Sequence, residues 1–278
     1  MESLKPLATE IGMFLTTEMI AVYVGLAMIS AGIREEYIIE STGEGIGVFG
    51  LGMLFATLLI LFIIKYLNRK IVFQMLFAWL IFVGSLFVFG SVLIFPLAAL
   101  LAGLVVAARF LMPRVWVQNV AMILSIAGIS PQLAMYFGTP TIIAILLLAS
   151  AYDYYAVFKT KHMIKMFESL MKHETPFTFV IPAKGSMSGE VNGKLHKKKK
   201  KGQREYYLLG TGDIAFPTIF VVALLADYSP LSAAFAFAGA IVGMIVDHLI
   251  LMKMKTAIPA LPAIAVCSIA AFLLSLVV

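Results

Sequence analysis

The stretch that decides the fold is LLGTGDIAFP, residues 208–217, which is followed closely by the apolar segment FVVALL, residues 220–225. Asp213 therefore lies inside a segment apolar enough to form a membrane helix. A carboxylate in hydrocarbon costs roughly 2.5 to 3.5 kcal/mol on the mildest scale, and such residues usually have a function. Gly210 and Gly212 remove side-chain bulk ahead of Asp213, so that another backbone can approach its carboxylate closely. The stretch predicts a functional carboxylate within the bilayer.

The composition is that of an integral membrane protein. Of the 278 residues, 62% are hydrophobic and 13% are charged, and a soluble domain carries about twice this share of charge. The net charge of +6 does not indicate nucleic-acid binding, because the basic residues lie in the connections between apolar segments. The single cysteine, Cys267, excludes a disulfide framework or a zinc–cysteine cluster. All four histidines lie near or beyond the predicted membrane ends, so we expect no metal and no cofactor.

Apolar runs of about 20 residues are needed to cross a bilayer, and the chain contains nine of them. We therefore expect an all-α, multi-pass protein of the cell membrane with nine transmembrane helices and the lipid bilayer as its surroundings. The nine runs cover residues 8–32, 46–66, 71–90, 92–112, 115–133, 139–160, 208–226, 231–252 and 257–277.

The placement of Lys and Arg predicts the orientation of these helices. In the nine-helix arrangement every Lys and Arg except Arg34 falls on the same side of the membrane. Cytoplasmic loops carry the excess of basic residues. The N-terminus is therefore expected in the cytoplasm and the C-terminus outside.

One long polar connection divides the chain. It separates six predicted helices from the last three, so we expect an N-terminal part (residues 1–165), a basic cytoplasmic loop (residues 166–207) and a C-terminal part (residues 208–278). Inside the loop, residues 197–201 are five consecutive lysines. Such a block is typical of a flexible, solvated segment that contacts anionic lipid headgroups.

The two flanks of this loop favour a different local structure. Residues 177–181 and 205–209 are rich in aromatic, β-branched and other apolar side chains, which suit short strands. A hypothesis beside the flexible loop is that these flanks pair and offer a strand edge to an extended peptide.

A second carboxylate, Asp153, lies on the sixth predicted helix. Asp153 precedes Lys159 by six residues, which is about 9 Å along a helix. Asp213 follows Arg204 by nine residues, or about 13 Å at most. The sixth and seventh helices are joined on the inner side and are antiparallel neighbours. We therefore expect both carboxylates at a similar depth, in the inner third of the bilayer.

The segment PALP, residues 259–262, reaches the same depth ahead of the ninth helix. Pro259 follows Lys255 by four residues, about 6 Å along the chain. Two prolines in four residues interrupt the helix start and leave backbone groups free to face a cavity. Two close carboxylates beside such a cavity share a proton, so that one accepts a proton from water and the other protonates a peptide carbonyl oxygen.

Three motifs in this order resemble the signatures of the presenilin and signal peptide peptidase family. They are Tyr152-Asp153, Gly210-x-Gly212-Asp213 and Pro259-Ala260-Leu261. The resemblance implies an intramembrane aspartic endopeptidase whose catalytic pair is Asp153 and Asp213. It further implies that the active site and the substrate-binding surface are shaped by Tyr152, Gly210, Gly212, Pro259, Ala260 and Leu261.

The resemblance also implies the partners. The substrates would be transmembrane proteins or signal peptides, cut in or near their membrane spans, and a homo-oligomer is compatible with the family. The predicted orientation is similar to that of presenilin, and the bare core resembles a microbial, archaeal homologue.

The alternative is a proton-coupled transporter or channel in which the Asp pair is a proton relay. A relay needs ionisable groups across the whole bilayer. Here they gather on one side, with little except Glu18 elsewhere, which favours the protease.

Overall fold

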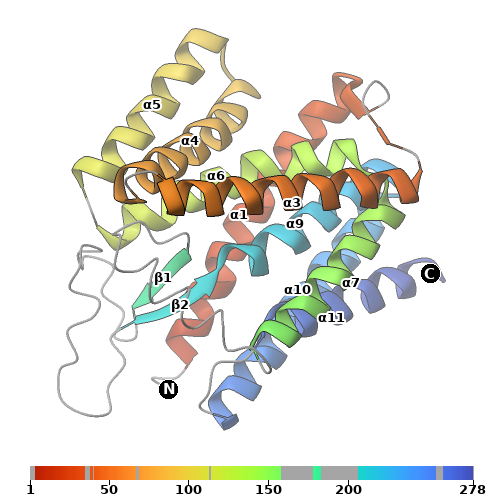
Figure 1. Ribbon diagram of the computed structural model, residues 1–278. Helices are drawn as coiled ribbons and strands as arrows, with labels where there is room; N and C mark the ends of the chain where they lie inside the picture. Colours follow the sequence, from red (N-terminus) through yellow and green to blue (C-terminus); the bar gives the residue numbers. More distant parts are fainter. Residues whose placement is uncertain are drawn as a thin grey trace.

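The structure is a computed structural model. The five lysines at 197–201, which were expected to form a flexible segment, lie outside the residues that it describes. Those residues are 4–34, 38–39, 41–66, 69–112, 114–157, 178–182, 206–254 and 259–277. They form a largely helical molecule with one small sheet (Figure 1). The elements are α1 (Leu4–Ser30), α3 (Thr42–Tyr66), α4 (Arg69–Gly90), α5 (Phe95–Leu111), α6 (Val115–Tyr136), α7 (Thr139–Tyr155), β1 (Thr178–Pro182), β2 (Tyr206–Gly210), α9 (Thr211–Asp227), α10 (Pro230–Met254) and α11 (Leu261–Ser275).

Each of the nine apolar runs corresponds to one helix of the described chain. Four helical segments are long and apolar enough to cross a membrane on their own: Pro6–Ser30, Ile71–Gly90, Val115–Tyr136 and Pro230–Leu251. Shorter apolar segments cover Thr42–Ala56, Phe95–Leu111 and Leu261–Ser275. A mostly helical chain with several helices able to cross a membrane is therefore confirmed, whereas the count of nine spans stays a prediction.

Two predicted boundaries were wrong, and both lie next to the predicted site. Residues 208–210 were expected to begin the seventh helix, but they belong to strand β2, and α9 begins at Thr211. The ninth helix was expected from residue 257, but α11 begins at Leu261. In the first case strand pairing overrides an apolar run, and in the second Pro259 precedes the helix start.

Helix α9 lies at the centre of the molecule. All residues from Pro217 to Leu224 are buried, which explains why this segment is apolar on every side. Helices α1, α6, α7, α10 and α11 all contact it. Figure 1 shows α9 passing between the α4–α5 pair and the α10–α11 pair. The helix that begins with GxGD is therefore the axis around which the other helices pack.

Helices α1 and α9 pack closely along one seam. A Cβ atom on Gly25 of α1 would lie 2.7 Å from Cγ1 of Val222, so only glycine permits this approach, as is common between membrane helices. Nearer the site, the Thr218 hydroxyl donates to Oε2 of Glu18 at 2.8 Å, and Glu18 is 3% exposed. Glu18 is thus a hydrogen-bonded residue that faces the helix bundle.

The far end of this seam is tied by Arg34 and Asp227. Nε of Arg34 donates to Oδ1 of Asp227 at 2.8 Å, and an η nitrogen of Arg34 donates to the carbonyl of Ala134. Oδ2 of Asp227 accepts hydrogen bonds from the backbone N–H and the hydroxyl of Thr139 at 2.8 and 2.7 Å. Asp227, the last residue of α9, is therefore a paired carboxylate. The ion pair also neutralises the one cation that departs from the charge pattern.

Replacing Arg34 by Met is expected to lower the free energy of unfolding by about 2 kcal/mol, because it leaves the carboxylate of Asp227, whose side chain is 21% exposed, without its counter-charge. Unfolding of the purified protein in mixed micelles measures this. The exposed Arg114 provides the control, since Arg114→Met should leave stability nearly unchanged. Adding Asp227→Asn to Arg34→Met should cost less than the sum of the two single changes. Strict additivity would contradict the pairing.

The two strands confirm that the flanks of the loop pair, whereas the strand edge offered to an extended peptide stays a prediction. They pair antiparallel, from Thr178 opposite Gly210 to Pro182 opposite Tyr206. Apolar strand side chains join a buried cluster with α1, α4, α6 and α10, and this cluster includes Phe179, Ile181, Leu209, Phe14 and Ile214. The sheet is thus anchored in the helical core, and β2 runs without a break into α9.

Candidate active site

Asp213 occupies the third position of α9, and the local sequence fixes its side chain. Gly210 is the N-cap residue, with φ −62° and ψ 140°. The backbone N–H of Gly210 donates a hydrogen bond to the Asp213 carboxylate. An acidic side chain three residues after the N-cap commonly reaches back to this N–H, and the positive end of the helix dipole favours it. The GxGD spacing therefore holds the carboxylate against the start of its own helix.

The two glycines of the motif have different surroundings. A Cβ atom on Gly210 would lie 2.9 Å from Oδ2 of Asp213, whereas one on Gly212 would come no closer than 3.7 Å, to the ring of Phe216. The first distance is too short for a real contact and the second is ordinary. Both glycines were expected to let another backbone approach. The structure gives Gly210 a further reason, which is to leave room for the catalytic candidate itself.

Asp153 lies near the end of α7, and its partner comes from the PAL segment. The backbone N–H of Leu261 donates a hydrogen bond to the Asp153 carboxylate. Leu261 is the first residue of α11, so its N–H has no partner within the helix. Pro259 and Ala260, both buried, precede it. The PAL motif thus brings a free backbone donor to Asp153.

The structure brings the carboxylates of Asp153 and Asp213 close enough to interact electrostatically. Helices α7, α9 and α11, which carry the three motifs, contact one another. Six of the eight predicted residues therefore either lie at this site or precede a residue that does: Asp153, Asp213, Gly210, Leu261, Pro259 and Ala260. Gly212 is the neighbour of Asp213 in the chain. Tyr152 differs, because it is 58% exposed, and its predicted role stays a prediction.

Sequence reasoning missed two further carboxylates. Asp247 of α10 interacts electrostatically with Asp153 and Asp213, and Glu10 of α1 interacts with Asp213 and Asp247. The sequence contained a signal for Asp247, which precedes Lys253 by six residues. Asp153 precedes Lys159 by the same interval, from which its depth in the bilayer was estimated.

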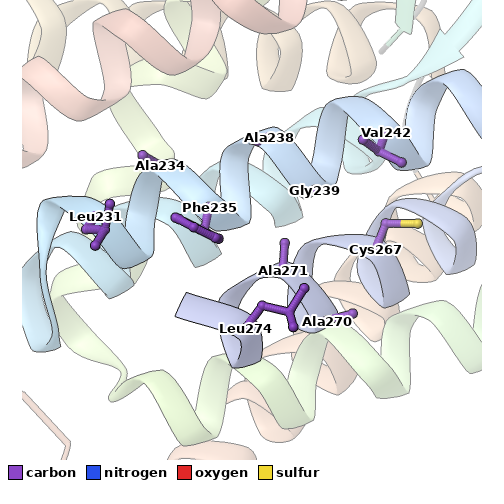
Figure 2. Close-up of a pocket in the computed structure, with 10 residues that line it drawn as sticks. All are labelled: Leu231, Ala234, Phe235, Ala238, Gly239, Val242, Cys267, Ala270, Ala271 and Leu274. Atoms are coloured by element: carbon purple, nitrogen blue, oxygen red, sulfur yellow. The ribbon is translucent and has the colours of Figure 1, made fainter. Parts of the chain in front are cut away.

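A groove of about 590 Å³ lies between α10 and α11, away from these carboxylates. Figure 2 shows the side chains that line it, none of which is acidic or basic. Such a surface suits contact with lipid tails rather than hydrolysis. The ten residues are Leu231, Ala234, Phe235, Ala238, Gly239, Val242, Cys267, Ala270, Ala271 and Leu274.

Comparison with known proteins agrees with this geometry. The sequence profile of the family described as "Signal-peptide peptidase, presenilin aspartyl protease" matches residues 11–278. No curated protein matches the chain. Two solved structures of a presenilin family intramembrane aspartate protease, in space groups P2 and C222, are each 22% identical to it. The first has a TM-score of 0.66 and 95% of both chains covered. The second has 0.68, with 98% of this chain and 99% of that one covered.

These findings define the class as intramembrane aspartyl proteases. The chain belongs to the signal-peptide peptidase and presenilin aspartyl protease family, which the profile matches over nearly its whole length. The resemblance seen in the three motifs is confirmed. The proton-coupled transporter is set aside by the same finding. At 22% identity the two solved structures support the fold.

Proposed function

We propose that Asp153 and Asp213 are the catalytic pair with which this protein hydrolyses peptide bonds in or near transmembrane segments. One observation carries the proposal. Two interacting carboxylates from α7 and α9 are each held by a backbone N–H, and the donors are Gly210 of the GxGD motif and Leu261 of the PAL motif. Such orientation is what general acid–base catalysis requires of its groups.

The chemistry follows that of an aspartic dyad. Two neighbouring carboxyl groups share one proton, because like charges so close cannot both ionise without cost. The unprotonated carboxylate takes a proton from water as the water oxygen bonds to the peptide carbonyl carbon. The protonated carboxyl gives its proton to the carbonyl oxygen. The C–N bond of the resulting diol then breaks as its nitrogen takes a proton from the first carboxyl and the second carboxylate takes one hydroxyl proton back, which restores the shared proton of the pair.

The substrate has to be extended at the cut, because the carbonyls of a helix are hydrogen-bonded and covered. Strand β2 leads into α9, so its backbone ends beside Asp213. Within the described chain the sheet has two strands, so β2 pairs with a strand along one edge. An extended peptide added along the other edge would gain backbone hydrogen bonds and pass the dyad. The irregular start of α11 would flank it.

The wider setting belongs to the same proposal. We propose nine membrane spans in the cell membrane, with the N-terminus in the cytoplasm and the C-terminus outside. Residues 1–165 would supply Asp153, residues 208–278 would supply Asp213 and the PAL motif, and residues 166–207 would join them on the cytoplasmic side. Transmembrane proteins or signal peptides would be the substrates, and self-association is compatible with this arrangement.

The experiment is cleavage of a tagged single-span reporter by the purified protein reconstituted in lipid. We expect two products whose new ends, identified by mass spectrometry, fall inside the span toward its cytoplasmic end. A version of the reporter whose cleaved segment is stabilised by alanine and leucine should be cut more slowly, because extension costs more. Cuts confined to the loops outside the span would contradict the proposed function.

A further inference from the structure

Strand β1 is held along its outer edge by a side chain of α6. Nδ2 of Asn119 donates to the carbonyl of Val180 at 2.8 Å, and the backbone N–H of Val180 donates to Oδ1 of Asn119 at 2.9 Å. Asn119 is 3% exposed. One amide side chain therefore satisfies both backbone groups of a strand residue, as a neighbouring strand would.

A second amide beside it continues this contact. Nε2 of Gln118 donates to the carbonyl of Thr178 at 3.3 Å, and Oε1 of Gln118 accepts a hydrogen bond from Nε of Arg109 on α5. The Arg109 guanidinium in turn lies 5.5 Å from the centre of the Phe77 ring on α4. Gln118 is fully buried and Arg109 is 3% exposed. Polar groups from α5 and α6 thus converge on β1, and buried amides persist only where they are bonded.

These contacts fix which groups of the sheet point outward. In an antiparallel pair, opposite residues alternate between those that bond each other and those whose N–H and C=O face away. Val180 uses both groups for Asn119, so Val180 and its partner Leu208 form a pair of the second kind. The N–H and C=O of Leu208 therefore face the outer edge of β2. Two residues on, the N–H of Gly210 faces the same edge, where it bonds Asp213.

Within the described part of the chain, the outer edge of β2 therefore presents unpaired backbone groups at Leu208 and then the Asp213 carboxylate at the next equivalent position. A peptide paired with Leu208 would run directly onto Asp213. The outer edge of β1, by contrast, is occupied at Thr178 and Val180. The asymmetry of the two edges comes from Asn119 and Gln118.

We propose that Asn119, supported by Gln118, is a positioning residue for cleavage. It closes the outer edge of β1 and holds the two-stranded sheet in the register that leads an extended substrate along β2 to Asp213. This inference rests on the proposed function, since it assumes that the substrate is cut at the dyad. Asn119 lies on α6 and contacts β1, the strand on the far side of β2 from the substrate, so it acts through the sheet.

The test replaces Asn119 by Leu, which is similar in size and lacks both hydrogen-bonding groups. The control is Gln132→Leu, which removes a partly buried amide from the same helix, one that bonds only to Sδ of Met28 at 3.2 Å among the contacts described. Asn119→Gln keeps the amide and provides a milder variant that should fold. Each protein cuts the single-span reporter, and the cleaved bonds are identified by mass spectrometry.

In the Asn119→Leu protein we expect at least a tenfold change in the ratio of products cut at the main bond to products cut two residues away. A slip of two residues keeps each side chain on its own face, so this is the step that a loosened strand takes. KM should rise more than kcat falls. Asn119→Gln should shift the ratio less, and Gln132→Leu should leave it as in the wild type. A product pattern unchanged in both Asn119 variants would overturn the positioning role.

Amide hydrogen exchange of the substrate-free protein separates this inference from the proposed function. Exchange of the peptide covering residues 178–182 should rise in Asn119→Leu and stay low in Gln132→Leu. If it does not rise, Asn119 does not hold β1, whatever the reporter shows. If the wild-type protein cuts no bond within the span, the proposed function fails, and the positioning role fails with it. The exchange result still decides whether Asn119 holds β1.

Discussion

Asp153→Asn and Asp213→Asn are each expected to lower kcat at least about 1,000-fold, because each substitution removes one of the two groups that move protons in the reaction. Asn keeps the size of the side chain and can still accept the backbone hydrogen bond from Leu261 or Gly210. The helices should therefore pack as before. Initial rates of reporter cleavage at saturating substrate measure the effect, and thermal unfolding confirms that the variants are folded.

Two comparisons sharpen this result. The double variant should be hardly slower than either single variant, because residues that act as one unit have non-additive effects. Asp247→Asn removes a third carboxylate that interacts with Asp153, and it should change kcat less than tenfold. If Asp247→Asn were as inactive as the other two, the pair would be wrongly assigned. If either Asp153→Asn or Asp213→Asn kept wild-type rates, the dyad would be excluded.

Much of the helical framework could be predicted because the bilayer demands long apolar runs. The central helix shows the limit of such patterns. Residues 208–210 are as apolar as the helix that follows, yet they pair with residues 178–180 as a strand. Hydropathy does not distinguish a buried strand from the first turn of a buried helix. The pairing partner lies about 30 residues away and is visible only in three dimensions.

The candidate site was predictable where charge and depth carried the signal. Asp153 and Asp213 are costly in a membrane, so each attracts attention by itself, and counting residues to the nearest boundary charge placed them together. The same count applied to Asp247 would have added it. The backbone donors could not be found in this way, because the free N–H of Leu261 is a consequence of where α11 begins.

Tertiary pairing was beyond the sequence in other places as well. Asn119 in isolation is an ordinary polar residue near the start of an apolar run, and nothing local identifies the strand that it contacts. Arg34 and Asp227 lie 193 residues apart and looked like two unrelated loop charges. Both contacts join segments that are far apart in the chain.

Gly210→Ala is expected to lower kcat/KM about 100-fold, because displacing a reacting group by about 1 Å has an effect of this size. The new methyl would lie 2.9 Å from Oδ2 of Asp213 and force the carboxylate away from its place at the start of α9. The backbone is not the cause, since φ −62° and ψ 140° suit alanine as well as glycine. Steady-state cleavage of the reporter measures the loss.

Gly212→Ala is the matched control, because its methyl would meet only the Phe216 ring, at an ordinary 3.7 Å. It should lose clearly less activity than Gly210→Ala. The stability of Gly210→Ala should stay level or rise by about 0.4 to 1 kcal/mol, since alanine restricts the unfolded chain, and unfolding in micelles tests this. Lost activity with retained stability would show that Gly210 serves the position of a carboxylate. A larger loss of activity in Gly212→Ala than in Gly210→Ala would instead mean that the glycines serve mainly to let the substrate backbone approach closely.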